Sequence, residues 1–120
     1  MQSYEKAAVL GSTAALTSLA SLYKAEYHQS EINNNSSAKD AALVNVIAYY
    51  NLAIKRGDIG AQTRKEVFSD VYNIDLTKQE QSLASKKANI TYKEILRKRR
   101  DLGLASFEDE NSSAAKDFSR

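Results

Sequence analysis

The sequence predicts an all-α protein in which antiparallel helical hairpins stack into an α-α superhelix, with a long helix capping the C-terminal end. The first observation is that its 120 residues include no Pro and only four Gly, so few points force the chain out of a helix. The second is a short pattern that recurs after 46 residues and is typical of a repeat array. It pairs Tyr4, Ala7, Gly11 and Ala15 with Tyr50, Ala53, Gly57 and Ala61.

Length and composition limit the class of protein. The chain suits one domain, and a hydrophobic content of 42% suits a globular fold. The absence of Cys excludes a disulfide framework and cysteine-based metal sites, but it fits cytosol and periplasm equally. The first residues lack a basic and then apolar leader, so we expect no signal peptide here. No apolar run approaches the ~20 residues of a membrane span.

Two helices are predicted at the start of the chain. The first runs over about 3–10 and ends at Gly11, because glycine tolerates the left-handed backbone that follows many helices. Ser12 or Thr13 is a suitable N-cap for the second helix. Its apolar side chains recur every three to four residues, and it continues to the polar turn cluster at 33–37.

The third and fourth helices are predicted from their end signals. Ser37, with Asp40 three residues later, resembles a capping box that opens the third helix. The apolar face of this helix is broad enough for the helix to be buried on more than one side. The helix ends at Gly57. Asp58 opens the fourth helix, and a turn is expected at 73–75.

The fifth helix has the strongest start signal. Thr77 and Glu80 form a full capping box, and the helix should run to Gly103 with a possible break at 89–91. The polar residues 104–120 predict a loosely held tail or a marginal short helix.

The net charge of +2 is distributed unevenly. Residues 1–76 carry a net charge of −1, residues 77–100 of +6 and residues 101–120 of −3. Any electrostatic function is therefore expected in the fifth helix. Its candidate contacts to nucleic acid or another anionic surface are Lys86, Lys87, Arg97, Lys98, Arg99 and Arg100. We favour the simpler interpretation that these charges keep a capping helix solvated, since Tyr92 is the only aromatic residue nearby for base stacking.

Small and aromatic residues at fixed spacing resemble the Sel1-like repeat, a relative of the tetratricopeptide repeat. In the first expected hairpin they are Gly11, Ala15, Leu19, Ala20 and Tyr23, followed by Ala48, Tyr49, Tyr50, Ala53, Gly57 and Ala61. The resemblance covers about residues 4–88 and implies an α-solenoid of helix pairs, each with a helix A and a helix B. It also implies a protein-interaction or scaffold role.

Two departures from the family pattern set the expected domain boundaries. A long polar stretch replaces the usual glycine loop before Asp40 and explains the long period. Lys65 and Ser69 stand where Leu and Tyr would recur in a further helix A. We therefore expect a domain over 1–103, with a repeat unit at 3–61, a C-terminal cap at 62–103 and a tail at 104–120. A cap of this kind presents a polar outer face.

We find no candidate catalytic site, and we expect no metal and no cofactor. His28 is the only histidine, and Glu31 is its only well-spaced companion, which is too few ligands for a metal. Neither a phosphate-binding glycine motif nor a nucleophile elbow is present. Tyrosines at helical spacing are expected to pack inside, namely Tyr4, Tyr23, Tyr49 and Tyr50. Tyr27, Tyr49 and Tyr72 could instead anchor an interface; packing is favoured for Tyr49, and Tyr27 fits either role.

The leading hypothesis is a non-enzymatic module that binds a protein or peptide of unknown identity on its helix-A surface. Helix geometry gives the candidate contacts Thr13, Thr17, Ser21, Lys24, Gln62 and Glu66. The alternative is a small basic domain that binds nucleic acid through the fifth helix. A third, structural hypothesis is the end of a longer array, in which the first helix packs on a further repeat or self-associates.

Overall fold

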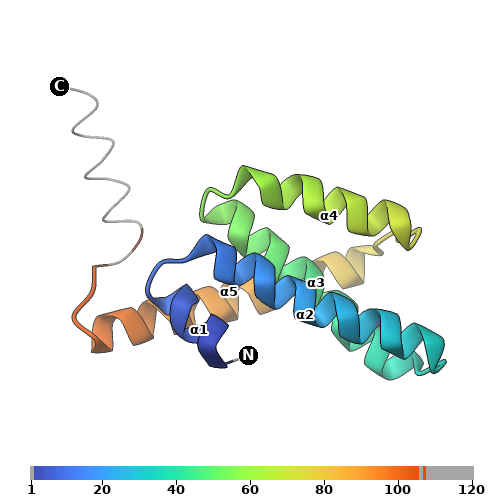
Figure 1. The fold of residues 1–120 in the computed structure, drawn as a ribbon, viewed down its shortest axis with the longest axis horizontal. Coiled ribbons are helices and arrows are strands. Elements are labelled where there is room, and N and C mark those ends of the chain that lie inside the picture. Colours follow the sequence, from blue (N-terminus) through green and yellow to red (C-terminus); the bar gives the residue numbers. More distant parts are fainter. Residues whose placement is uncertain (1, 106, 108–120) are drawn as a thin grey trace.

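The computed structural model describes residues 2–105 and 107, and the regular structure in this part of the chain is entirely helical (Figure 1). The all-α prediction is therefore confirmed. The helices are α1 (Gln2–Val9), α2 (Thr13–Ile32), α3 (Ser36–Lys55), α4 (Ile59–Val71) and α5 (Lys78–Asp101).

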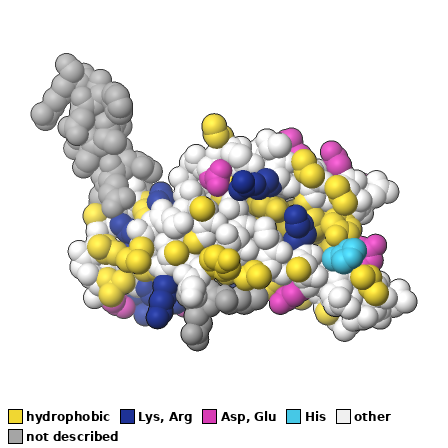
Figure 2. All heavy atoms as spheres, in the orientation of Figure 1, with side chains coloured by type: hydrophobic (Ala, Val, Ile, Leu, Met, Phe, Trp, Pro, Cys, Tyr) yellow, Lys and Arg dark blue, Asp and Glu magenta, His cyan; other side chains and the backbone are white. Residues whose placement is uncertain are grey.

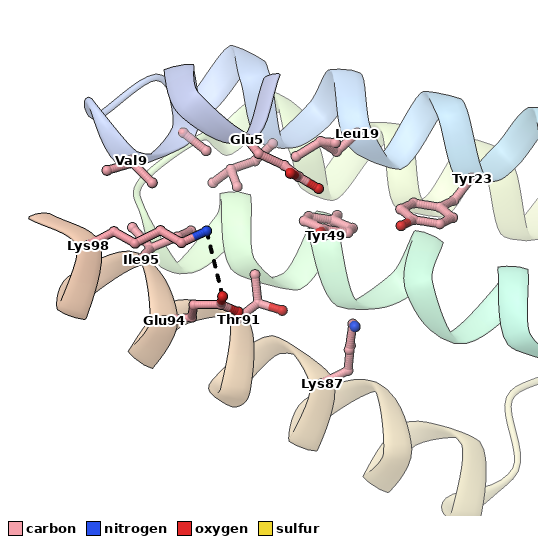
Figure 3. A pocket seen from close by; sticks show the side chains of 12 residues that line it. Glu5, Val9, Leu19, Tyr23, Tyr49, Lys87, Thr91, Glu94, Ile95 and Lys98 are labelled. Atoms are coloured by element: carbon pink, nitrogen blue, oxygen red, sulfur yellow. Dashed lines mark ion pairs between the residues drawn. The ribbon is translucent and has the colours of Figure 1, made fainter. Parts of the chain in front are cut away.

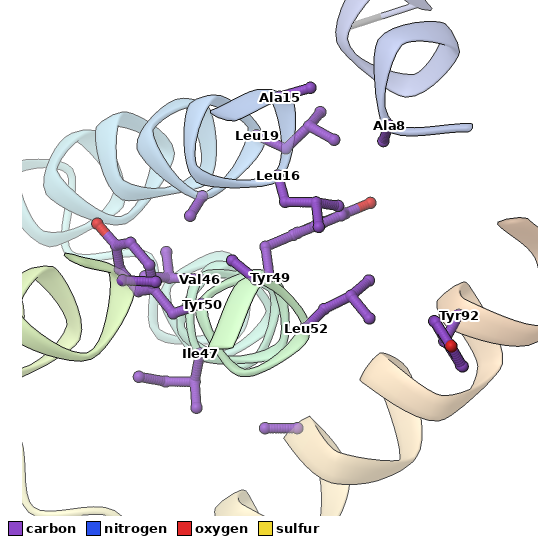
Figure 4. Close-up of a cluster of buried hydrophobic side chains, with 14 of the residues drawn as sticks. Ala8, Ala15, Leu16, Leu19, Val46, Ile47, Tyr49, Tyr50, Leu52 and Tyr92 are labelled. Carbon is purple, nitrogen blue, oxygen red and sulfur yellow. The ribbon is translucent and has the colours of Figure 1, made fainter. Parts of the chain in front are cut away.

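Helix α3 is the centre of the molecule. It packs against α2, α4 and α5, while the short α1 lies against α2 and α5 (Figures 1 and 4). The helix can be surrounded in this way because its apolar residues cover most of its circumference. The largest fully buried side chains come from α3 and from α2, and they are Tyr50, Leu19, Ile47, Leu52 and Val46.

All five helices end in the same way. The residue after each final turn has a positive φ, between +54° and +112°. The backbone N–H of this residue and that of the next residue donate back to carbonyls of the last turn, as in Gly11 N–H to Ala8 O and Ser12 N–H to Ala7 O. This is the Schellman arrangement, which needs a residue that tolerates a left-handed backbone. Glycine and asparagine alternate in this place: Gly11, Asn34, Gly57, Asn73 and Gly103.

The three glycines follow one another at equal intervals of 46 residues, so the ends of α1, α3 and α5 are also 46 residues apart in the sequence. The 46-residue repeat predicted from the sequence includes only the first two of these glycines. The residue one helical turn after each of these glycines is also buried. It is Ala15 after Gly11, Ala61 after Gly57 and Phe107 after Gly103. Our division into a repeat unit (3–61) and a cap (62–103) stays a prediction, and the spacing indicates that α5 shares the same period.

The helix starts lie close to their predicted positions, but the capping chemistry differs at two of them. Asp58 precedes α4 as predicted but makes no side-chain capping hydrogen bond. Ser12 caps α2, and the Thr77–Glu80 box is complete, with both reciprocal hydrogen bonds present. The prediction that Ser37 caps α3 is wrong: Asn35 does so, accepting from the N–H of Ala38. Helix α5 also continues without interruption through 89–91, so the possible break does not occur.

The chain after α5 is anchored by an aromatic ring. Phe107 is 2% exposed, and the guanidinium carbons of Arg56 and Arg99 lie 3.3 and 4.1 Å from its ring centroid. We call this set of three residues the Phe107 clamp. Phe107 is thus packed onto the fold, while the expected tail over 104–120 stays a prediction. Residues 106 and 108–120 lie outside the described residues.

Arg99 also joins the two ends of the fold. Its side chain donates to the carbonyl of Val9 at 2.8 Å and to that of Ala105 at 2.8 Å. Val9 is the last residue of α1 and lies 90 positions from Arg99 in the sequence. The start of the chain is thus held by a residue near its end.

Candidate protein-binding surface

An open cavity of about 370 Å³ lies between α2 and α4, with α3 at its base. We call it the α2–α4 groove. Figure 2 shows hydrophobic side chains along this strip, with basic side chains beside them. The apolar wall is α4, where Val67 is 54% and Val71 is 69% exposed. The two valines thus give the groove one exposed aliphatic side.

The base of the groove is held rigid by aromatic packing. The Phe68 ring lies 5.5 Å from that of Tyr27 and 5.2 Å from that of Tyr72. The Tyr27 and Tyr72 rings meet edge to face at 5.1 Å, and the Tyr72 hydroxyl is 3.0 Å from Nδ1 of His28. Tyr27 is 4% exposed, so the role left open for it is resolved as packing.

The groove carries positive charge. Lys24 on α2 and Arg64 on α4 are the charged side chains among those that line it. Burial raises the pKa of the Tyr50 hydroxyl at its base, and the positive charge of Arg64 opposes that rise. A segment bearing carboxylates would therefore meet favourable potential along the groove.

The structure divides the candidate contacts predicted for the helix-A surface. Ser21 and Lys24 line the α2–α4 groove, and their role in binding stays a prediction. Gln62 and Glu66 are exposed on α4 and hydrogen-bond to each other at 2.9 Å, outside the groove lining. Thr13 is half-buried at the start of α2.

Thr17 corrects the prediction, because it is only 6% exposed and its hydroxyl donates to the Ala14 carbonyl. The groove residues that the sequence analysis missed are Arg64, Val67 and Val71. They recur at spacings of three and four on α4, so helical periodicity could have placed them on one face.

A second, smaller cavity of about 210 Å³ lies on the other side of α2, between α1, α3 and α5 (Figure 3). The Tyr23 and Tyr49 rings stack there with centroids 5.6 Å apart. Lys87 points into this space from α5, and Lys98 is 3.6 Å from Glu94 (Figure 3). Burial, followed by the nearby Tyr23, Glu5 and Glu94, raises the pKa of Tyr49 to about 12. The hydroxyl is thus held protonated, which suits a structural role.

The basic residues of α5 do not form one uniform surface. Lys86, Lys87, Arg97, Lys98 and Arg100 are exposed, as an anion-binding face requires. Arg97 reaches Glu94 at 4.0 Å and Asp101 at 3.6 Å, so part of the charge is locally neutralised. Arg99 is only 4% exposed, and the expectation that it contacts an anion is therefore wrong. Anion binding by the other five residues stays a prediction.

The described residues also bear on other kinds of site. Among them, His, Asp and Glu side chains nowhere gather in threes that could hold a metal ion. None of the helices described has the length and apolar character needed to cross a bilayer.

Comparison with protein-family models, with curated proteins and with solved structures finds no match to this chain. The resemblance to the Sel1-like repeat therefore rests on the residues quoted above.

Proposed function

We propose that this chain is a non-enzymatic interaction module of the Sel1-like repeat type, which binds a protein segment in the α2–α4 groove. The observation that carries the proposal is the exposed aliphatic wall of Val67 and Val71 above an aromatic base. A rigid base lowers the entropic cost of binding, because little of the surface has to be ordered when the partner arrives.

The alternation of glycine and asparagine turns supports the repeat assignment. Glycine follows α1, α3 and α5, and asparagine follows α2 and α4, as expected if each pair of helices is one structural unit. In this scheme α2 and α4 are successive A helices. The α2–α4 groove then belongs to the surface that such arrays use for binding.

The lining of the groove favours a partner segment that combines acidic and large apolar residues. Apolar side chains would cover Val67 and Val71, while carboxylates would pair with Lys24 and Arg64. The charged pairs would lie at the rim, where they set specificity and association rate more than affinity.

The test is a selection from a random peptide display library on the immobilised protein, followed by affinity measurements with the enriched peptides. We expect enrichment of Asp and Glu around large apolar residues. The double change Val67→Asp and Val71→Asp should weaken binding by at least about tenfold, since it removes the apolar wall and repels the acids. Ile90→Asp on α5 is the matched control, because Ile90 is exposed to the same 54% as Val67.

Failure to enrich any peptide, or equal loss of affinity in the Ile90 control, would contradict binding in the groove. Changing Lys24 and Arg64 to Glu should remove the preference for acidic peptides while apolar preference remains. Binding of labelled nucleic acid that falls steeply with salt and is lost in Arg97→Ala and Arg100→Ala would favour the α5 alternative instead.

A further inference from the structure

A separate cleft of about 650 Å³ opens where α1 meets the end of α5. Its apolar part is formed by Val9 and Leu10 from the end of α1 and by Leu102 from the end of α5. Leu10 is 67% and Leu102 is 64% exposed, although both are large aliphatic side chains. Figure 2 shows hydrophobic side chains gathered at this end of the molecule.

The two leucines hold equivalent places. Each stands immediately before the glycine that ends its helix, Gly11 for α1 and Gly103 for α5. Arg56 holds the same place before Gly57 in α3, and there the side chain is drawn into the Phe107 clamp. The leucines thus remain on the surface at two matching helix ends that converge on one cleft.

The charges around the cleft are balanced on both walls. The α1 wall carries Glu5 and Lys6, and the α5 wall carries Lys98 and Asp101. A strongly acidic or strongly basic partner would meet repulsion as well as attraction here. A surface with one acid and one base on each wall is complementary to itself when turned about a two-fold axis, because each base can then face an acid.

We propose that this cleft is the contact between two copies of the chain, related by a two-fold axis. Leu10 and Leu102 of each copy form the apolar centre, and Lys6 of one copy pairs with Asp101 of the other at the rim. This matches the usual anatomy of an interface, with an apolar core and a polar edge. The existing contacts of Asp101 with Arg97 and of Lys98 with Glu94 are exposed ion pairs, so they yield readily to new partners.

The seven residues that line the cleft are few beside the ~20 or more per partner in a stable interface, so the dimer forms and dissociates with concentration. Sedimentation velocity over a dilution series should show the average mass of the full chain rising from that of the monomer towards twice that value. Leu10→Glu and Leu102→Glu should each raise the dissociation constant by at least about tenfold, since both place acids in the apolar centre. Ile59→Glu is the control, because Ile59 is 90% exposed but lines none of the cavities described above.

The charge pairing is tested by reversal. Lys6→Asp and Asp101→Lys should each weaken the dimer several-fold, and the two changes together should restore it. Helical circular dichroism and a cooperative thermal unfolding transition verify that each variant is folded. A wild-type chain that stays monomeric at the highest concentration, leucine variants that associate like the wild type, or reversal without restoration would each overturn the proposal. Failure of the groove to bind peptide leaves this test unaffected.

Discussion

At the scale of single residues, burial decides the protonation of the tyrosines that the sequence places at helical spacing. Tyr49 is 8% exposed and stacks on Tyr23 with the ring planes 9° apart. Removing its hydroxyl from water disfavours the phenolate, and the nearby Glu5 and Glu94 disfavour it further. The neutral tyrosine is therefore part of the folded state over the whole physiological range.

This arrangement predicts alkaline destabilisation. The pKa of Tyr49 rises from its ordinary value of 10.0 to about 12 in the fold, so its contribution to stability is complete below pH 10 and is lost as pH rises through 12. Tyr49→Phe keeps the ring and removes this dependence. Urea unfolding from pH 9 to 12 should show the free energy of unfolding falling more steeply in the wild type than in the variant. Parallel curves would refute a raised Tyr49 pKa.

Arg99 is a buried residue that its neighbours in the sequence do not distinguish from exposed basic residues. It stands among Arg97, Lys98 and Arg100, and residue type gives no reason to separate these four. Helical spacing does give one, because Arg99 follows the buried Tyr92 and Ile95 on the same face of α5. The burial is stable because backbone carbonyls accept from its guanidinium, and those carbonyls come from segments whose position depends on the whole fold.

At the scale of helices, single residues with a left-handed backbone end each helix and reverse the chain. Every described helix ends at a residue of positive φ, and in three cases this residue is glycine. The sequence predicted those three ends because glycine marks them directly. It did not select Asn35 as the cap of α3, since 33–37 contains five residues that can all cap a helix.

The glycine turns are predicted to tolerate substitution differently from a helical glycine. Gly57 has φ +96° and open space around an added Cβ, so Gly57→Ala should cost about 1 kcal/mol from backbone strain. Gly60 lies inside α4, where alanine favours the helix by up to ~1 kcal/mol; the tight 3.3 Å approach of an added Cβ to the Asp58 carboxylate offsets part of this gain. Chemical denaturation should place the two variants on opposite sides of the wild type, or Gly60→Ala level with it. A Gly57→Ala variant as stable as the wild type would contradict the strain.

At the scale of the whole molecule, the contacts of α5 with α1 and α3 could not be predicted from the sequence. The helices themselves were predictable because their periodicity, caps and glycine ends are local signals. The meeting of α1 with α5 depends on distant residues, and the polar composition after Gly103 concealed the anchoring role of Phe107. Among the predicted contacts, Ser21 and Lys24 line the α2–α4 groove. Its apolar wall was not predicted, because the packing of α4 determines which apolar residues of that helix stay exposed.

The joining of the two ends by Arg99 is open to a direct measurement. Arg99→Met keeps much of the side-chain length but leaves the Val9 carbonyl without its donor and removes one cation from the Phe107 clamp. We expect a loss of about 2–4 kcal/mol in the free energy of unfolding. Arg100→Met, at an exposed neighbour, is the matched control and should change stability by less than ~0.5 kcal/mol. Equal effects of the two substitutions would show that Arg99 is not a structural tie.

The contact between Val9 and Arg99 also affects how the protein unfolds. A helix of eight residues such as α1 does not persist by itself, and in a linear array the first helix would fray without disturbing the last. Here the opening of α1 releases a buried guanidinium of α5, so its backbone amides should exchange with solvent in step with those around Arg99. Loss of structure then starts at α1 and at the end of α5 together, and the described helices melt as one cooperative unit.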